Sequence, residues 1–145
     1  MLRKGAYILI LELGKPSSIG IGKLGEFHFN SGYYTYIGSA LNSLDGRLKR
    51  YFQKSPRKVH WHIDYFMNAA EAVGAYYCES EERLECRIAE GMAERYALAA
   101  EGFGSSDCKC PGHLFFLGKK LPEVFKKDKL GLRGIRLINL GGGIF

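Results

Sequence analysis

The stretch GYYTYIGSALNSLDGRLKRYF, residues 32–52, joins an aromatic run to a basic, helix-like run. Its alternation predicts a strand that places Tyr34 and Tyr36 on one face and Tyr33 on the other. Gly38 ends the aromatic run, and because it has no side chain a backbone or a ligand can approach it closely. The stretch therefore predicts a strand, a turn of small residues and a helix.

The helix is expected over about residues 44–53, because Leu44, Leu48 and Tyr51 recur at the spacing of one helix face. Arg47 falls on another face, close to the helix start. Free N–H groups and a guanidinium both favour an anion at such a place. Spacing alone leaves two interpretations open, a phosphate site and a solvated arginine.

Charge is unevenly distributed along this chain of 145 residues, whose formal net charge is +6. Residues 79–101 hold seven glutamates against three arginines. Six basic side chains and no acidic one occur between residues 47 and 58: Arg47, Lys49, Arg50, Lys54, Arg57 and Lys58. One surface is therefore expected to be positive and suited to a polyanion, with an ordinary solvated face as the alternative.

Residues 5–13 are apolar on both alternating faces and indicate a buried strand, and the glycine-rich residues 19–32 indicate a small inserted hairpin. Further strands are expected at 72–80, at 114–118 and near the C-terminus, and helices at 60–70, at 80–100 and in part of 119–129. Strands mixed with helices in this way indicate an α+β fold with a small, mainly antiparallel sheet flanked by helices. We divide the chain into residues 1–118 and a basic extension, 119–145, packed on the same domain.

Glu85 continues an apolar helical stripe made of Ala89, Met92 and Tyr96. Burying its charge is costly unless the carboxylate is paired or holds a metal. A single carboxylate near phosphate-binding groups suits Mg²⁺, which keeps most of its waters. An outward-pointing glutamate that favours the helix dipole is the alternative.

The tyrosines of the aromatic run could pack or move protons. An ordinary tyrosine has a pKa of about 10, so at neutral pH it needs a neighbouring cation, or a metal-bound water, before it can act as a base. Arg47 and a metal at Glu85 could supply these two effects.

Four soft ligands, Cys86, Cys108, Cys110 and His113, make a zinc site one interpretation. Their spacing is not the paired Cys-x2-Cys, so a tightly turned loop with packed thiols stays open. No targeting signal or membrane-length apolar run is visible, and we expect a cytoplasmic protein whose cysteines are thiols or metal ligands rather than disulfides.

Residues 36–38, Tyr-Ile-Gly, followed by Arg47 and Tyr51, resemble the core of the GIY-YIG nuclease family, with Gly-Ala-Tyr at residues 5–7 as the first half of the motif. The helix GRLKRYF is similar to that of the incision nuclease of bacterial nucleotide excision repair. The likeness is closest to the Uri-like subfamily of small stand-alone proteins, through HWHIDYF, ECRIAE and FGSSDCKCPGHLFF. It spans about residues 5–116.

The resemblance implies a metal-dependent endonuclease that hydrolyses DNA phosphodiester bonds in DNA repair or processing. Glu85 would hold Mg²⁺ or Mn²⁺, and a water activated through Tyr7 or the metal would attack the phosphorus. The implied catalytic residues are Tyr7, Tyr36, Arg47 and Tyr51. The expected DNA contacts are Gly38, Lys49, Arg50, Lys54, Arg57 and Lys58.

Two departures from the family pattern are visible. The two motif halves are separated by the inserted hairpin, and the family's asparagine has no clear match, with Ser105, Ser106 or Asp107 in its place. Two other functions stay open, a nucleic-acid-binding module without catalysis and a zinc-stabilised interaction domain. A protein partner also stays open.

Overall fold

The computed structural model describes residues 4–52, 59, 61–105, 108–126 and 136–138. Its elements follow a mixed order, with most strands before or between helices. They are β1 (Gly5–Leu13), β2 (Ser17–Gly20), the 3₁₀ turn η1 (Gly22–Leu24), β3 (Glu26–Phe29), β4 (Gly32–Ala40), α1 (Leu44–Phe52), α2 (His62–Phe66), β5 (Glu71–Glu79), α3 (Glu85–Ala93), β6 (Ala97–Leu98), β7 (Leu114–Gly118), α4 (Glu123–Lys126) and β8 (Arg136–Ile138).

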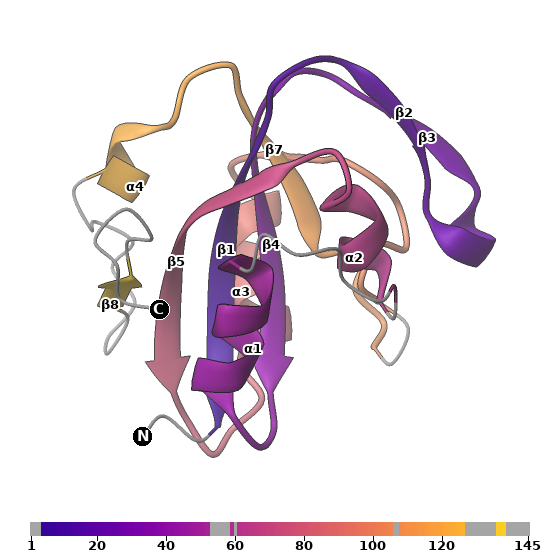
Figure 1. Ribbon diagram of the computed structural model, residues 1–145. Helices are drawn as coiled ribbons and strands as arrows, with labels where there is room; N and C mark the ends of the chain where they lie inside the picture. The colour runs from indigo at the N-terminus through magenta and orange to yellow at the C-terminus, as the bar shows by residue number, and fades with distance from the viewer. Residues whose placement is uncertain (1–3, 53–58, 60, 106–107, 127–135, 139–145) are drawn as a thin grey trace.

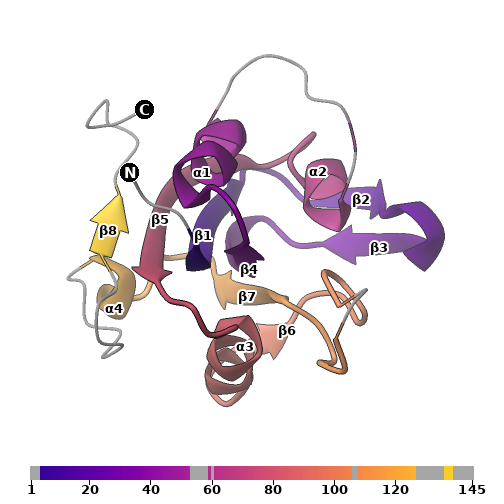
Figure 2. The ribbon, with the colours of Figure 1, turned by 90° about the horizontal axis from the view of Figure 1, so that it is seen from below.

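The central sheet has six strands in the order β6-β7-β4-β1-β5-β8, and every pairing in the described part of the chain is antiparallel. Helices α1 and α2 lie on one side of this sheet and α3 on the other (Figures 1 and 2). The predicted α+β class, with a mainly antiparallel sheet flanked by helices, is confirmed.

The central strand β1 is buried on both faces. Leu9 and Leu11 pack with the residues under α1 and α2, whereas Ile8 and Ile10 pack with those under α3. Because both faces are covered, every inward and outward position is apolar until Glu12, which is exposed. This explains why the strand predicted over residues 5–13 shows no polar alternation.

A side-chain hydroxyl caps the start of helix α1. Ser43 Oγ accepts a hydrogen bond from the Gly46 N–H at 3.0 Å, which satisfies a free amide of the first turn. Leu44, Leu48 and Tyr51 are all buried, as their spacing predicts. The helix follows the prediction up to Phe52.

The inserted hairpin is confirmed as a separate two-stranded sheet of β2 and β3, which projects from the central sheet in Figure 1. It starts at Ser17, two residues before the predicted start at residue 19. The buried side chains of Ile21 and Phe29 anchor it in the core beneath α2.

The helix predicted over residues 80–100 is wrong at both ends. Ser80 Oγ caps only a bend, accepting from the Glu82 N–H at 3.0 Å, and α3 begins at Glu85. The helix ends at Ala93, and Ala97–Leu98 instead forms an edge strand paired with β7. The helix expected over 60–70 is also shorter than predicted. It is reduced to α2, a single helical turn, which non-helical turns follow.

The described part of the C-terminal extension contacts the central sheet. Strand β8 pairs with β5, and Tyr76 donates a hydrogen bond of 2.5 Å to the carbonyl oxygen of Phe125. The glycine-rich end expected after the last strand lies outside the described residues.

Candidate functional site

The register between β1 and β4 places the two halves of the sequence motif, residues 5–7 and residues 36–38, side by side. Tyr7 lies opposite Gly38, and Leu9 lies opposite Tyr36. The Tyr7 ring crosses the position that a Cβ at Gly38 would occupy. A Cβ at residue 38 would therefore overlap the hydroxyl end of Tyr7 and force this ring to shift.

Three of the predicted catalytic residues, Tyr7, Tyr51 and Arg47, lie close together. The hydroxyls of Tyr7 and Tyr51 are 2.5 Å apart, and their rings lie 5.6 Å apart between centroids. The guanidinium of Arg47 lies close enough to both hydroxyls to lower the pKa of each phenol. Because Tyr7 comes from β1 and the other two from α1, the packing of one helix on the sheet assembles the group.

Arg47 is held at two further points. Its Nη1 donates to the carbonyl oxygen of Ser39 at 3.3 Å, and its guanidinium lies 4.1 Å from the centroid of the Trp61 ring. Stacking on an indole orients a guanidinium while leaving its edge available to an anion. Sequence reasoning missed Trp61, which is separated from the basic helix by a short segment outside the described residues.

The tyrosines of this site are neutral at physiological pH. Burial raises the pKa of Tyr7 well above its ordinary value, and the Tyr51 and Tyr36 phenols raise it further, outweighing the opposing effect of Arg47. Burial also raises the pKa of Tyr36 and of Tyr51. Arg47 lowers the pKa of Tyr7 and of Tyr51, but burial outweighs it, and the expectation that Arg47 and a metal together make a tyrosine act as a base stays a prediction.

Tyr36 connects this group to the loop before β7. Its ring lies 6.3 Å from the ring of Tyr7 and 5.8 Å from that of Phe103, in the loop before β7. Glu85, at the start of α3, is near enough to add to the raised pKa of Tyr36.

Glu85 is buried, with 5% of its surface exposed. One carboxylate oxygen, Oε1, pairs with Arg83 Nη2 at 2.6 Å. The other, Oε2, has no hydrogen-bond partner among the described residues. Half of this carboxylate is thus compensated, and the buried half could accept a cation.

The predicted DNA-contacting residues separate in the structure. Lys49 is exposed. Arg50 instead donates to Oδ2 of the fully buried Asp64 at 2.8 Å, which anchors α1 to α2. The same oxygen accepts the Trp61 N–H at 2.8 Å. Lys54, Arg57 and Lys58 lie outside the described residues.

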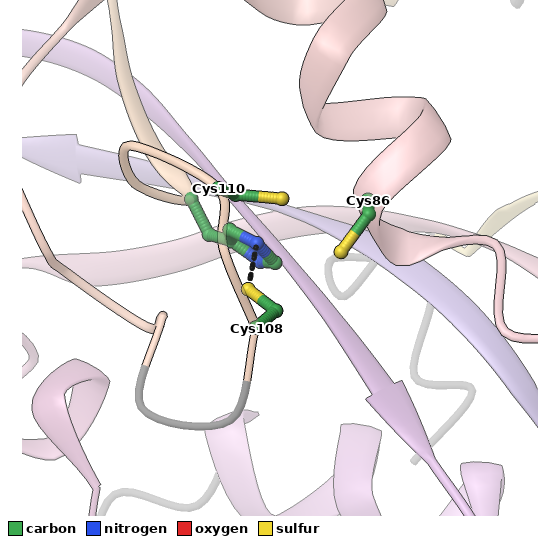
Figure 3. A group of neighbouring side chains, drawn as sticks. Cys86, Cys108 and Cys110 are labelled. Carbon is green, nitrogen blue, oxygen red and sulfur yellow. Dashed lines mark hydrogen bonds between the residues drawn. The ribbon is translucent and has the colours of Figure 1, made fainter.

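A second group of side chains lies beside Glu85. Cys86, on α3, faces Cys108 and Cys110 from the loop before β7 (Figure 3). With His113 they offer four ligand atoms that all lie within 4.8 Å of one another. The cysteines are free thiols, and burial raises the pKa of Cys86 to about 12. The cluster could hold a metal ion.

The positions considered for the missing asparagine are only partly described. Ser105 Oγ is buried without a hydrogen-bond partner among the described residues, whereas Ser106 and Asp107 lie outside them. His62, which sequence reasoning did not single out, accepts the Gly104 N–H at 2.8 Å and so ties α2 to this loop.

Comparison with known proteins identifies the family. Residues 6–130 match a family described as a domain of unknown function, DUF123, and the chain belongs to it. No curated protein and no solved structure matches the chain. Among the described residues, we find no helix with the length and apolar character needed to cross a membrane.

Proposed function

We propose that the protein is a metal-dependent phosphodiesterase of the GIY-YIG type that cleaves DNA. The observation that carries the proposal is the Tyr7–Gly38 pair with the Arg47 guanidinium beside the hydroxyls of Tyr7 and Tyr51. This arrangement presents a fixed guanidinium and phenol donors at one point. Such donors recognise a phosphate and stabilise the charge that grows on its oxygens during hydrolysis.

The residues present fit the divalent metal that this activity requires. Glu85 offers a buried carboxylate oxygen without a hydrogen-bond partner among the described residues. The carboxylate is close enough to Tyr36 to raise the pKa of its phenol. Oxygen ligands of this kind suit Mg²⁺ or Mn²⁺. The ion, when bound, supplies Lewis acidity toward a phosphate oxygen and lowers the pKa of its water.

The chain's own residues then divide the remaining work. Arg47 binds a non-bridging phosphate oxygen and stabilises its developing charge, while Trp61 keeps the guanidinium oriented. The neutral Tyr7 and Tyr36 phenols donate hydrogen bonds that position the phosphate and the attacking water. Tyr51 holds the Tyr7 hydroxyl in place.

For the four-ligand cluster we propose Zn²⁺. Three thiols and an imidazole are soft or borderline donors, which select zinc over the oxygen-seeking Mg²⁺. The two metal sites would therefore hold different ions despite the adjacent positions of Glu85 and Cys86.

A cleavage screen tests the phosphodiesterase. The purified chain is incubated with Mg²⁺ and with single-stranded, duplex, flapped and damaged DNA. Arg47→Ala and Glu85→Gln are each expected to lower the rate by about two to three orders of magnitude. Lys23→Ala and Glu94→Gln remove the same charges at exposed positions and should leave the rate unchanged. Full activity in the Arg47 or Glu85 variant would refute the assignment.

A nucleic-acid-binding module without catalysis is the second candidate, and the burial of the phenols favours it. Tyr7 and Tyr51 are 1% and 2% exposed, which limits direct contact with a substrate. A salt-dependent mobility-shift assay run beside the screen separates the two. Binding without product on every DNA, in the presence of Mg²⁺ and of Mn²⁺, selects this candidate.

A further inference from the structure

The cysteine–histidine cluster joins two segments that are far apart in the sequence. Cys86 belongs to the first turn of α3, whereas Cys108, Cys110 and His113 belong to the loop that leads into β7. No regular hydrogen-bond ladder links these two segments in the described residues. The side chains of the cluster bring these two segments together (Figure 3).

The histidine of the cluster is oriented as a metal ligand. Its Nδ1 lies 3.0 Å from the carbonyl oxygen of Ile37 in β4. A carbonyl only accepts, so Nδ1 carries the proton, and Nε2 presents its lone pair toward Cys108 Sγ at 3.4 Å. Zinc-binding histidines are typically oriented by such a bond from the other ring nitrogen. His113 is 3% exposed, so the ring cannot turn to solvent.

The separations in the cluster suit a tetrahedral ion. Zn–S bonds of about 2.3 Å and Zn–N bonds of about 2.0 Å put sulfur and nitrogen ligands about 3.5 Å apart. The Cys108 Sγ–His113 Nε2 distance is 3.4 Å, and all four ligand atoms lie within 4.8 Å of one another. Four protein ligands leave no position for water, which is the composition of a structural site.

The loop that carries the ligands also contacts the proposed active site. Phe103 packs its ring against Tyr36, and the Gly104 N–H binds His62. On the other side of the cluster, Cys86 directly follows Glu85. An ion bound between the two segments would fix the start of α3 and hold the Glu85 carboxylate beside Tyr36.

We infer that Cys86, Cys108, Cys110 and His113 form a closed structural zinc site that positions Glu85. The zinc site stands on the cluster alone, whereas its positioning role rests on the proposed phosphodiesterase. Glu85 is on the helix across the sheet from the basic helix α1 (Figure 2). Losing zinc is therefore expected to lower kcat while leaving the KM for DNA unchanged.

Metal content and cobalt substitution test the site without any activity measurement. The full chain should purify with about one zinc per molecule, and Cys108→Ser should bind zinc at least about 100-fold more weakly, since even outer partners of ligands contribute about 10–100-fold. Cys78→Ser is the matched control, because Cys78 lies on β5 outside the cluster. Cobalt bound to the folded chain should give the absorption of a tetrahedral thiolate site.

Equal zinc content in Cys108→Ser and Cys78→Ser, a disulfide between cluster cysteines, or iron in place of zinc would overturn the site. If Cys108→Ser does not fold, a chelator selective for zinc over magnesium is applied to the natural chain. It should lower the melting temperature reversibly, and an unchanged melting temperature in zinc-stripped protein contradicts the proposal. Zinc binding without DNA cleavage would refute the phosphodiesterase alone, and an unchanged kcat after stripping would refute the positioning role.

Discussion

The Tyr7–Tyr51–Arg47 group and the cysteine–histidine cluster lie on different supports. Tyr7 comes from the central strand, and its partners come from a helix packed against it, so ladders and a helix set their positions. The cysteines come from a helix start and an irregular loop. The first group is held by hydrogen bonds between Tyr7 and Tyr51 and from Arg47 to Ser39. The second brings together three thiols and an imidazole that an ion would bind.

This difference indicates which region needs a bound ion to keep its geometry. Regular backbone positions the tyrosine–arginine group before any ligand binds. The cluster instead depends on side-chain contacts between segments that no ladder connects within the described part of the chain. The predictions below either separate the two regions or show that they depend on each other.

The largest effect is expected at Phe103, which links the regions. Its fully buried ring contacts Tyr36 on one side and His62 on the other. Phe103→Ala should lower the free energy of unfolding by about 3–5 kcal/mol, because it leaves a cavity. Urea unfolding measures this, with the exposed Leu41→Ala as control, expected within about 0.5 kcal/mol of the natural chain. A small loss at Phe103 would mean that the loop does not support the site.

Gly38→Ala tests the tyrosine–arginine group by itself. The added methyl overlaps the Tyr7 ring, and overpacking of this kind costs about 1–3 kcal/mol. Gly91→Ala on α3 is the matched control, since a Cβ there meets no atom within 4 Å. Alanine should stabilise that helix position by about 0.5–1 kcal/mol. Chemical unfolding of both variants should therefore give opposite signs.

Tyr51→Phe removes one hydroxyl and keeps the ring. We expect a loss of about 1 kcal/mol in unfolding free energy together with slower DNA cleavage, because Tyr7 loses a partner. Tyr34→Phe removes a comparable bond, from its hydroxyl to the carbonyl oxygen of Asn30 at 2.6 Å, away from the site. Equal cleavage by the two variants would show that Tyr51 serves packing only.

The smallest effect at neutral pH concerns the Tyr7 phenol. Burial raises its pKa in the folded state, so above pH of about 10 the unfolded chain binds fewer protons than the folded one. Its contribution to stability is full below that pH and is lost as pH rises further. Denaturant unfolding from pH 8 to 11 should show falling stability, with a shallower fall in Tyr7→Phe. Parallel curves for the two proteins would contradict burial of this phenol.

Local patterns account for the parts of the fold that could be predicted. The apolar run of β1, the alternation of tyrosines in β4 and the Leu44–Leu48–Tyr51 face each reflect packing that a residue makes through its own element. The early end of α3 could not be predicted. Ala97 and Leu98 do not continue the helix, because they pair with β7, a strand near residue 115. That interaction is long-range and leaves no periodic signal.

The candidate site was predictable to a similar extent. Arg47, Tyr51 and Gly38 belong to one short stretch, and their mutual placement follows from strand, turn and helix. The stacking of Trp61 on Arg47 and the pairing of Arg50 with Asp64 arise where α2 docks beside α1. Neither partner is at helical or strand spacing from the arginine that it contacts.

The central position of β1 determines the order in which the molecule should open. Nearly every residue of this strand is paired on both sides, with β4 and with β5, so its amide hydrogens should be among the slowest to exchange with solvent. Helix α3 has no such double protection and can detach in partial opening. A molecule opened in this way would keep Tyr7 against Gly38 but lose Glu85, so under the proposed function it would bind phosphate without cleaving it.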